Sequence, residues 1–184
     1  MDARDAARLV APAVDVGGIW ADLGAGHGTF TAALANLLGP AGTVYAVERD
    51  RSAVTSLETL ARRARDQSAR IVVMRADFTQ PLALPPLDGA LLANALHFVP
   101  NAEQPGVLRR VAERLASGGR IVVVEYDDRP ASRWVPYPVS LARLAQLADE
   151  AELRDVRPIG RAESAFGGTM YAAHVGQAIE RVRA

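Results

Sequence analysis

Glycines and acids at the ends of two short apolar runs are the residues in this chain whose types and spacing best suit ligand binding. The first apolar run, residues 19–23, leads into a loop that contains Gly24, Gly26 and Gly28. Glycine has no Cβ, so such a loop lets a ligand approach the backbone closely. The next apolar run, residues 44–47, ends at Glu48, whose carboxylate can accept hydrogen bonds from a ribose diol. Together they indicate a site for a nucleoside-containing cofactor.

The glycine spacing distinguishes between cofactor classes. A dinucleotide site uses G-x-G-x-x-G, whereas this loop reads G-x-G-x-G and is preceded at two residues by Asp22. The pattern resembles the first motif of class I S-adenosylmethionine-dependent methyltransferases, and the resemblance covers roughly residues 18–175. It implies an α/β fold: a doubly wound, mostly parallel seven-stranded sheet with helices on both faces and a C-terminal antiparallel hairpin. We expect residues 1–184 to form this single domain.

The resemblance also implies which residues bind S-adenosylmethionine. It places the glycine loop and its acid at the methionine end of the cofactor and Glu48 at both ribose hydroxyls. Asp77 follows the third apolar run, where the family has an acid that accepts from the adenine amino group; Phe78 suits either the adenine or the core. The expected cofactor-binding residues are Asp22, Gly24, Ala25, Gly26, Gly28, Glu48, Arg49, Asp77, Phe78 and Asn94.

Composition excludes several competing chemistries. The formal net charge is zero, so no overall field favours nucleic acid or an anionic membrane. The chain has no Cys and no Lys, which removes disulfides, cysteine nucleophiles, a P-loop lysine and Schiff bases. Residues 1–5 are charged rather than apolar, unlike a signal peptide, and residues 89–101 are too short an apolar run to cross a membrane. We therefore expect a cytoplasmic protein.

Strand and helix signals alternate along the chain, as in a doubly wound parallel sheet. The expected strands are residues 19–23, 44–47, 71–74, 89–93 and 121–124, and the tail from Leu153 to Val175 is expected to form two strands joined around 162–168. The expected helices include 30–38, Arg51–Arg65 capped by Asp50, and 141–151. Another helix is expected to begin at an Asn101 cap with Gln104 three residues on. Its apolar stripe runs to Leu115, and it ends at Gly118.

The segment Asn94–Val99 follows the fourth expected strand and corresponds to the family's motif at the methyl-transfer channel. It lacks the Pro-Pro-aromatic run of amino-directed DNA methyltransferases and resembles the small-molecule branch. His97 suits a general base, and equally a hydrogen-bonded loop histidine. The expected substrate-binding residues are His97, Tyr126, Arg133, Trp134 and Tyr137, with the acceptor between Asn94–Val99 and Tyr126–Tyr137. A solvated loop is the alternative for the latter segment. We expect no metal.

Several alternatives stay open. The methyl acceptor is expected to be a small organic molecule, with RNA or protein as the alternative. A non-catalytic module that binds S-adenosylmethionine or S-adenosylhomocysteine would keep the same glycine loop and Glu48. A nicotinamide-dependent oxidoreductase would need a different glycine spacing. The acceptor site is either open, completed by the second subunit of a homodimer, or covered by the amphipathic segment Met1–Val16.

Overall fold

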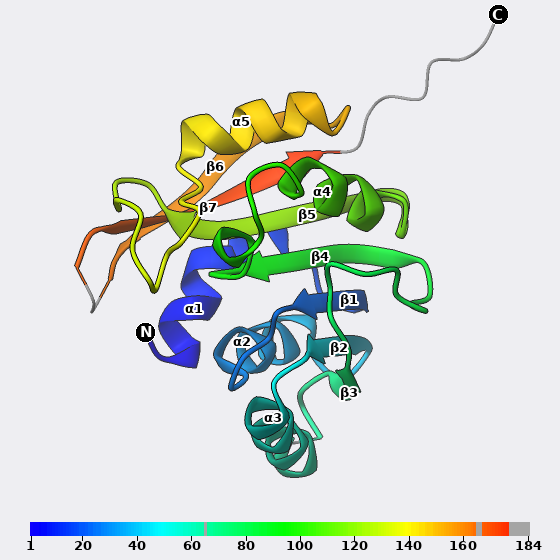
Figure 1. The fold of residues 1–184 in the computed structure, drawn as a ribbon. Helices are drawn as coiled ribbons and strands as arrows, with labels where there is room; N and C mark the ends of the chain where they lie inside the picture. The colour runs from blue at the N-terminus through cyan, green and yellow to red at the C-terminus, as the bar shows by residue number, and fades with distance from the viewer. Residues whose placement is uncertain (65, 165–166, 177–184) are drawn as a thin grey trace, which may run out of the picture.

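One seven-stranded sheet organises the computed structural model, which describes residues 1–64, 66–164 and 167–176 (Figure 1). The strands are β1 Gly18–Leu23, β2 Gly42–Glu48, β3 Arg70–Arg75, β4 Leu87–Ala93, β5 Leu115–Tyr126, β6 Arg154–Glu163 and β7 Thr169–Gly176. Their order across the sheet is β3-β2-β1-β4-β5-β7-β6. The first five pair in parallel, and β7 pairs antiparallel with both β5 and β6. This confirms the expected mostly parallel sheet with a C-terminal antiparallel hairpin.

Helices cover both faces of the sheet (Figure 1). They are α1 Ala3–Val10, α2 Thr29–Leu38, α3 Arg51–Arg63, α4 Gln104–Ala112 and α5 Leu141–Glu150. Side chains alternate along a strand, so Val44 and Ala46 of β2 lie on one face; Val44 packs with α1 and α2, and Ala46 packs with Leu57 of α3. The opposite face is covered by α4 and α5. None of the helices in the described ranges is long and apolar enough to cross a membrane.

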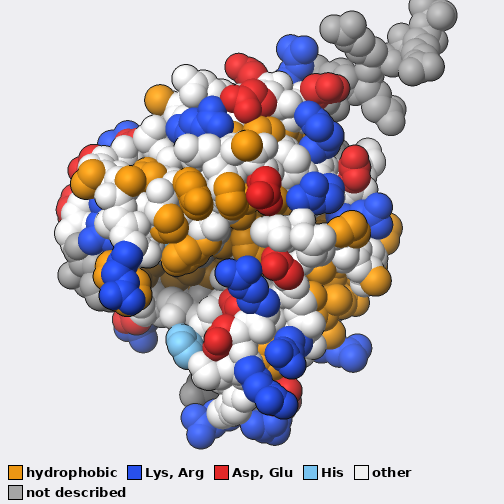
Figure 2. Space-filling view, viewed as in Figure 1, with side chains coloured by type: hydrophobic (Ala, Val, Ile, Leu, Met, Phe, Trp, Pro, Cys, Tyr) orange, Lys and Arg blue, Asp and Glu red, His pale blue; other side chains and the backbone are white. Residues whose placement is uncertain are grey.

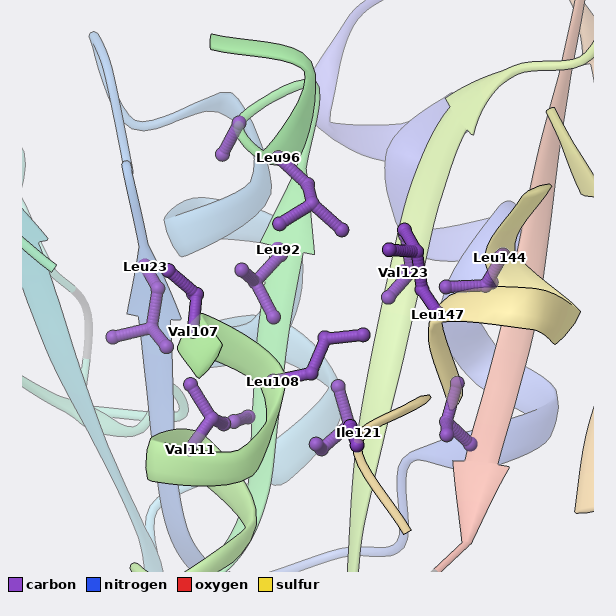
Figure 3. Packing of buried hydrophobic residues seen from close by; sticks show 14 of the residues in the cluster. Leu23, Leu92, Leu96, Val107, Leu108, Val111, Ile121, Val123, Leu144 and Leu147 are labelled. Atoms are coloured by element: carbon purple, nitrogen blue, oxygen red, sulfur yellow. The ribbon is translucent and has the colours of Figure 1, made fainter. Parts of the chain in front are cut away.

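The core under α4 and α5 fixes the carboxyl ends of the central strands (Figure 3). Leu92 of β4 and Val123 of β5 are fully buried there, as is Leu108 of α4. Burial of such a side chain stabilises the fold by about 1.5–3 kcal/mol relative to exposure. Because β4 and β5 are held from this face, the loops that follow them start from fixed positions.

The helix after β4 differs from the sequence prediction at both ends. It begins at Gln104 without a side-chain cap, so the expected Asn101 cap is wrong. The Gln104 side chain is buried, and its amide donates to the carbonyls of Leu96, Val99 and Tyr137, with N···O distances of 3.4, 3.1 and 3.4 Å. The helix ends at Ala112, and Leu115, expected on its apolar stripe, already pairs with Leu87 in the sheet. Pairing with β4 overrides the helical pattern.

Strand β5 begins six residues before the expected start at residue 121, and the other expected elements lie within about three residues of where the periodicity placed them. The helix expected over Arg51–Arg65 ends at Arg63 and has the predicted Asp50 cap, whose carboxylate accepts from the Ala53 N–H; Arg65 lies outside the described residues. The two terminal strands form the expected hairpin, and Ala165 and Phe166 of its turn are likewise outside the description. The same holds for residues 177–184, the end of the expected domain.

Candidate functional site

A cavity of about 400 Å³ opens at the carboxyl ends of the parallel strands. Figure 2 shows a hollow on this side of the molecule, floored by hydrophobic side chains and bordered by Arg side chains. Ligands bind at this edge of open α/β sheets, where the strand order reverses; here the reversal lies between β1 and β4. Eight expected cofactor-binding residues line the cavity: Gly24, Ala25, Gly26, Glu48, Arg49, Asp77, Phe78 and Asn94.

The glycine loop forms one wall of this cavity. All three of its glycines have positive φ, which side-chain-bearing residues rarely adopt. A Cβ on Gly24 would lie 2.8 Å from the Ala95 Cβ, so this glycine allows the loop after β4 to approach. A Cβ on Gly26 would meet nothing within 4 Å, which leaves open space for a ligand above its backbone. Gly28 instead caps α2 and packs against Leu57 and Leu60, outside the residues that line the cavity.

Glu48 ties the end of β2 to the glycine loop. Its Oε2 accepts from the Gly26 N–H at 2.9 Å, and its Oε1 accepts from the N–H groups of Arg49 and Asp50 at 2.7 and 2.8 Å. A carboxylate has about four acceptor positions, so one remains for a hydroxyl group. The strand-end position of Glu48 indicated ligand binding, but these backbone bonds follow from the turn after β2 and could not be read from the motif.

Asp22 lies beneath the glycine loop rather than in the cavity. It is buried, and its Oδ2 accepts from the Thr31 hydroxyl at 2.6 Å, which links β1 to α2. Burial raises the pKa of Asp22 to about 7, against the effect of the Thr31 bond, and the nearby Glu48 charge raises it further. The contact with Thr31 supports the expectation that this acid fixes the loop, whereas direct contact with a ligand is not available to a carboxyl 1% exposed.

Asp77 and Phe78 come from the irregular loop, residues 76–86, that joins β3 to β4. Asp77 Oδ1 accepts from the Thr79 N–H and hydroxyl at 2.9 and 2.8 Å, and Arg49 Nη1 lies 3.3 Å from its Oδ2. Partial burial acts to raise the pKa of Asp77, but these hydrogen bonds outweigh it and hold the pKa below its usual range. Phe78 packs against Gly24 at the base of the cavity.

Asn94 stands at the boundary between this cavity and a second one. The second cavity has a volume of about 160 Å³ and includes Asn94, Tyr126 and Phe30 in its lining. Asn94 has a left-handed backbone, with φ of 51°, and its N–H donates to the Val124 carbonyl at 2.8 Å. Its side-chain Oδ1 is buried and has no hydrogen-bond partner within the described part of the chain. Such an atom at a cavity wall suits a ligand that brings a donor.

His97 lies behind the site, outside the described residues that line the two cavities. It is 2% exposed, its Nδ1 lies 2.6 Å from Glu125 Oε2, and its N–H donates to Glu125 Oε1 at 3.2 Å. This corresponds to the hydrogen-bonded loop histidine rather than to a general base in contact with substrate. Glu125 was not expected to take part; its position at the end of an otherwise apolar strand was the signal in the sequence.

The other expected substrate-binding residues are spread over the segment after β5. Tyr126 is buried and lines the second cavity, while Arg129 lies over its ring, 4.6 Å from the centroid. Trp134 is 69% exposed, with Arg133 stacked on its ring at 4.9 Å. The Tyr137 N–H donates to the His97 carbonyl at 3.0 Å. This bond joins the two segments between which the acceptor was expected. The second cavity includes the first residue of each segment, Asn94 and Tyr126, and extends from there toward α1 and α2.

The described residues contain no group of three or more His, Cys, Asp or Glu side chains that could hold a metal ion.

The N-terminal segment lies against the site: α1 packs on α2 with Ala6, Leu9 and Val10 buried, and Met1 lines the second cavity. The N-terminal segment therefore borders the second cavity.

Several solved structures with this fold are named as methyltransferases. The 1,6-didemethyltoxoflavin-N1-methyltransferase of Burkholderia thailandensis, solved with its substrate and S-adenosylhomocysteine, has a TM-score of 0.75 at 19% identity, covering 96% of this chain and 78% of that one. The CcbJ methyltransferase of Streptomyces caelestis has a TM-score of 0.73 at 20% identity, covering 97% and 90%. Mitomycin 7-O-methyltransferase has a TM-score of 0.72 at 21% identity. The match covers 95% of this chain but only 53% of that enzyme's chain. These likenesses show the fold.

No curated protein matches the chain in sequence. Residues 21–119, more than half of the chain, match the family described as "Methyltransferase domain". The match begins within β1, includes the glycine loop and Glu48, and extends into β5. With the cavity at the strand ends and the seven-stranded sheet, it establishes the family. The chain belongs to the methyltransferase-domain family, whose members use S-adenosylmethionine.

Proposed function

We propose that the chain transfers a methyl group from S-adenosylmethionine to a small organic acceptor. The observation that carries the proposal is the arrangement of two cavities that meet at Asn94, one of them walled by the glycine loop and Glu48. The structural relatives support the acceptor class, because the acceptors in their names, such as didemethyltoxoflavin and mitomycin, are small molecules. The zero formal net charge agrees with an uncharged or weakly charged partner.

The residues of the larger cavity suit the parts of the cofactor. Glu48 has one acceptor position left for a ribose hydroxyl, and Asp77 and Phe78 are available to the adenine amino group and ring. The open space above Gly26 leaves room for the methionine end. When bound, S-adenosylmethionine would supply an activated methyl group: the acceptor's lone pair would bond to the methyl carbon, the carbon–sulfur pair would stay on sulfur, and the acceptor would release its proton.

The chain's own task is placement of the acceptor and exclusion of water. His97 supports this as a positioning residue, because its contacts with Glu125 fix the segment that carries Ala95 and Phe98 into the cavity wall. A proton acceptor from the protein is not required where the acceptor is an amine, whose proton becomes acidic once nitrogen carries the methyl group.

Isothermal titration calorimetry tests the cofactor half of the proposal. We expect S-adenosylmethionine and S-adenosylhomocysteine to bind with one-to-one stoichiometry, and NAD to bind at least about a hundredfold more weakly. Tight NAD binding with no heat from either sulfur nucleoside would reject the proposal. Methyl transfer to RNA or protein that falls steeply with added salt, with none to small molecules, would reject the acceptor class instead.

A further inference from the structure

The second cavity takes Asn94 and Tyr126 from the two segments between which the acceptor is expected, and the rest of its lining comes from outside those segments. It lies on the α1–α2 side of the sheet edge, and its lining includes Phe30 at the start of α2 and Met170 of β7, which belong to one buried cluster. Its connection to the cofactor cavity is Asn94, which lines both. A molecule held there would lie beside the cofactor cavity, on the far side of the Asn94 side chain.

We propose that this second cavity binds the methyl acceptor, and that the acceptor is a neutral molecule about the size of one substituted benzene ring that carries a hydroxyl or amine hydrogen. The inference rests on the proposed function. The size follows from the cavity volume of about 160 Å³. An apolar protein cavity of about 150 Å³ is large enough to bind benzene.

The neutral charge follows from the lining. Its apolar part comes from Met1, Phe30, Tyr126 and Met170, and its polar side chains are Thr29, Asn94 and Ser164. None of the described residues that line it carries a charged side chain. A carboxylate or ammonium group moved into such surroundings loses hydration, and no side chain of the lining offers it a paired charge, which is unfavourable.

The hydroxyl or amine hydrogen follows from Asn94. The side-chain Oδ1 is a hydrogen-bond acceptor, and it is buried without a partner in the described chain. A ligand O–H or N–H would supply the missing donor, whereas a ligand without one would leave the oxygen unpaired. The same hydrogen bond would hold the oxygen or nitrogen of the acceptor at the wall that the two cavities share.

The inference can be tested with phenol, fluorobenzene and benzoate as probes, titrated by ligand-observed NMR into protein saturated with S-adenosylhomocysteine. We expect phenol to bind at least about tenfold more tightly than fluorobenzene, which lacks the donor, and than benzoate, which is charged. In Asn94→Gly, which keeps the left-handed backbone accessible, the preference for phenol over fluorobenzene should disappear.

A blocking variant with a matched control locates the probe. Thr29 is exposed at the start of α2 and lines the cavity, so Thr29→Trp should weaken phenol at least about tenfold and change S-adenosylhomocysteine affinity by less than about twofold. Thr55→Trp, on an exposed position of α3, should change neither. Tighter binding of benzoate, an unchanged phenol preference in Asn94→Gly, or no phenol binding to cofactor-loaded protein would overturn the inference. Failure of S-adenosylhomocysteine to bind at all would instead reject the proposed function.

Discussion

Glu48 makes three backbone hydrogen bonds before any ligand is considered, to Gly26, Arg49 and Asp50. Its carboxylate therefore shapes the glycine loop and also offers an acceptor to the ribose. Asp77 contacts the cavity through a carboxylate that is already engaged by Thr79 and Arg49. The two acids at the strand ends should consequently contribute unequally to cofactor binding.

We predict that Glu48→Ala weakens S-adenosylhomocysteine binding about 10–100-fold and more than Asp77→Ala does. The reason is that loss of the carboxylate leaves the Gly26 N–H and a ribose hydroxyl without their partner, at about 1–3 kcal/mol for an unpaired buried group. Calorimetric titration of both variants measures the difference. Glu150→Ala, on the exposed end of α5, serves as the control. Equal affinities for wild type and Glu48→Ala would contradict the ribose role.

Asp22 gives the stability of the protein a specific pH dependence. Burial raises its folded-state pKa to about 7, above the usual value of 3.8. The folded protein thus holds this proton where the unfolded chain has released it. The stabilising contribution is fully present below about pH 4 and is lost as the pH rises through about 7.

We predict that Asp22→Asn removes this dependence. Between pH 4 and pH 8 the free energy of unfolding of the wild type should fall by about 2–4 kcal/mol more than that of the variant. The Asn oxygen can still accept from the Thr31 hydroxyl, so the link between β1 and α2 is kept. Urea unfolding at several pH values measures it, with exposed Asp149→Asn as the control. Parallel pH profiles for wild type and Asp22→Asn would show that the carboxyl is not protonated in the folded state.

At the scale of elements, the loop between β1 and α2 divides its glycines between two tasks. Gly26 has open space where a Cβ would lie, whereas a Cβ on Gly28 would lie 2.9 Å from side-chain carbons of Leu57 and Leu60. Both have positive φ, 53° and 94°. The first value falls in the left-handed region that other residues occasionally adopt, and the second lies beyond it.

We predict that Gly28→Ala lowers the free energy of unfolding by about 2–4 kcal/mol, through backbone strain and overpacking against α3. Gly26→Ala should cost only about 1–2 kcal/mol of stability but weaken S-adenosylhomocysteine more than tenfold, because its methyl group would occupy space left for the ligand. Urea unfolding and calorimetric titration of the pair separate the two effects. Loss of affinity in Gly28→Ala together with loss of stability in Gly26→Ala would contradict the assignment of ligand binding to Gly26 and of packing to Gly28.

The connection after β4 shows why some elements could not be predicted. The sequence Asn101 to Gln104 is close to a capping box, and local chemistry alone favours a helix start there. The Gln104 side chain is instead buried and donates hydrogen bonds to the carbonyls of Leu96, Val99 and Tyr137. The first two of these carbonyls belong to the connection between β4 and α4 itself. A tertiary contact with a residue 33 positions away, Tyr137, lies beyond any local pattern.

At the scale of the whole molecule, the periodic segments predicted the alternation of strands and helices, and the glycine loop and Glu48 predicted which sheet edge binds the cofactor. The sequence predicted Asn94 and Tyr126 beside the acceptor, but it could not predict the part of the second cavity that Phe30 and Met170 line. The cavity unites Phe30, Asn94, Tyr126 and Met170, and their meeting depends on the strand order and on the register of β5 with β7, where Tyr126 pairs with Met170. The His97–Glu125 pair likewise requires β4 and β5 to be neighbours.

The cofactor cavity draws its walls from segments that follow β1, β2, β3 and β4, so a ligand bound there stabilises the whole sheet rather than one part of it. We predict one calorimetric unfolding transition, with equal calorimetric and van't Hoff enthalpies. S-adenosylhomocysteine at a hundred times its Kd should add about 2.7 kcal/mol to the free energy of unfolding and raise Tm by about 5–10 °C. NAD at the same concentration should raise Tm by less than about 2 °C. Two transitions, with only the first shifted by S-adenosylhomocysteine, would show that the C-terminal hairpin and α5 unfold independently and that residues 1–184 are more than one cooperative unit.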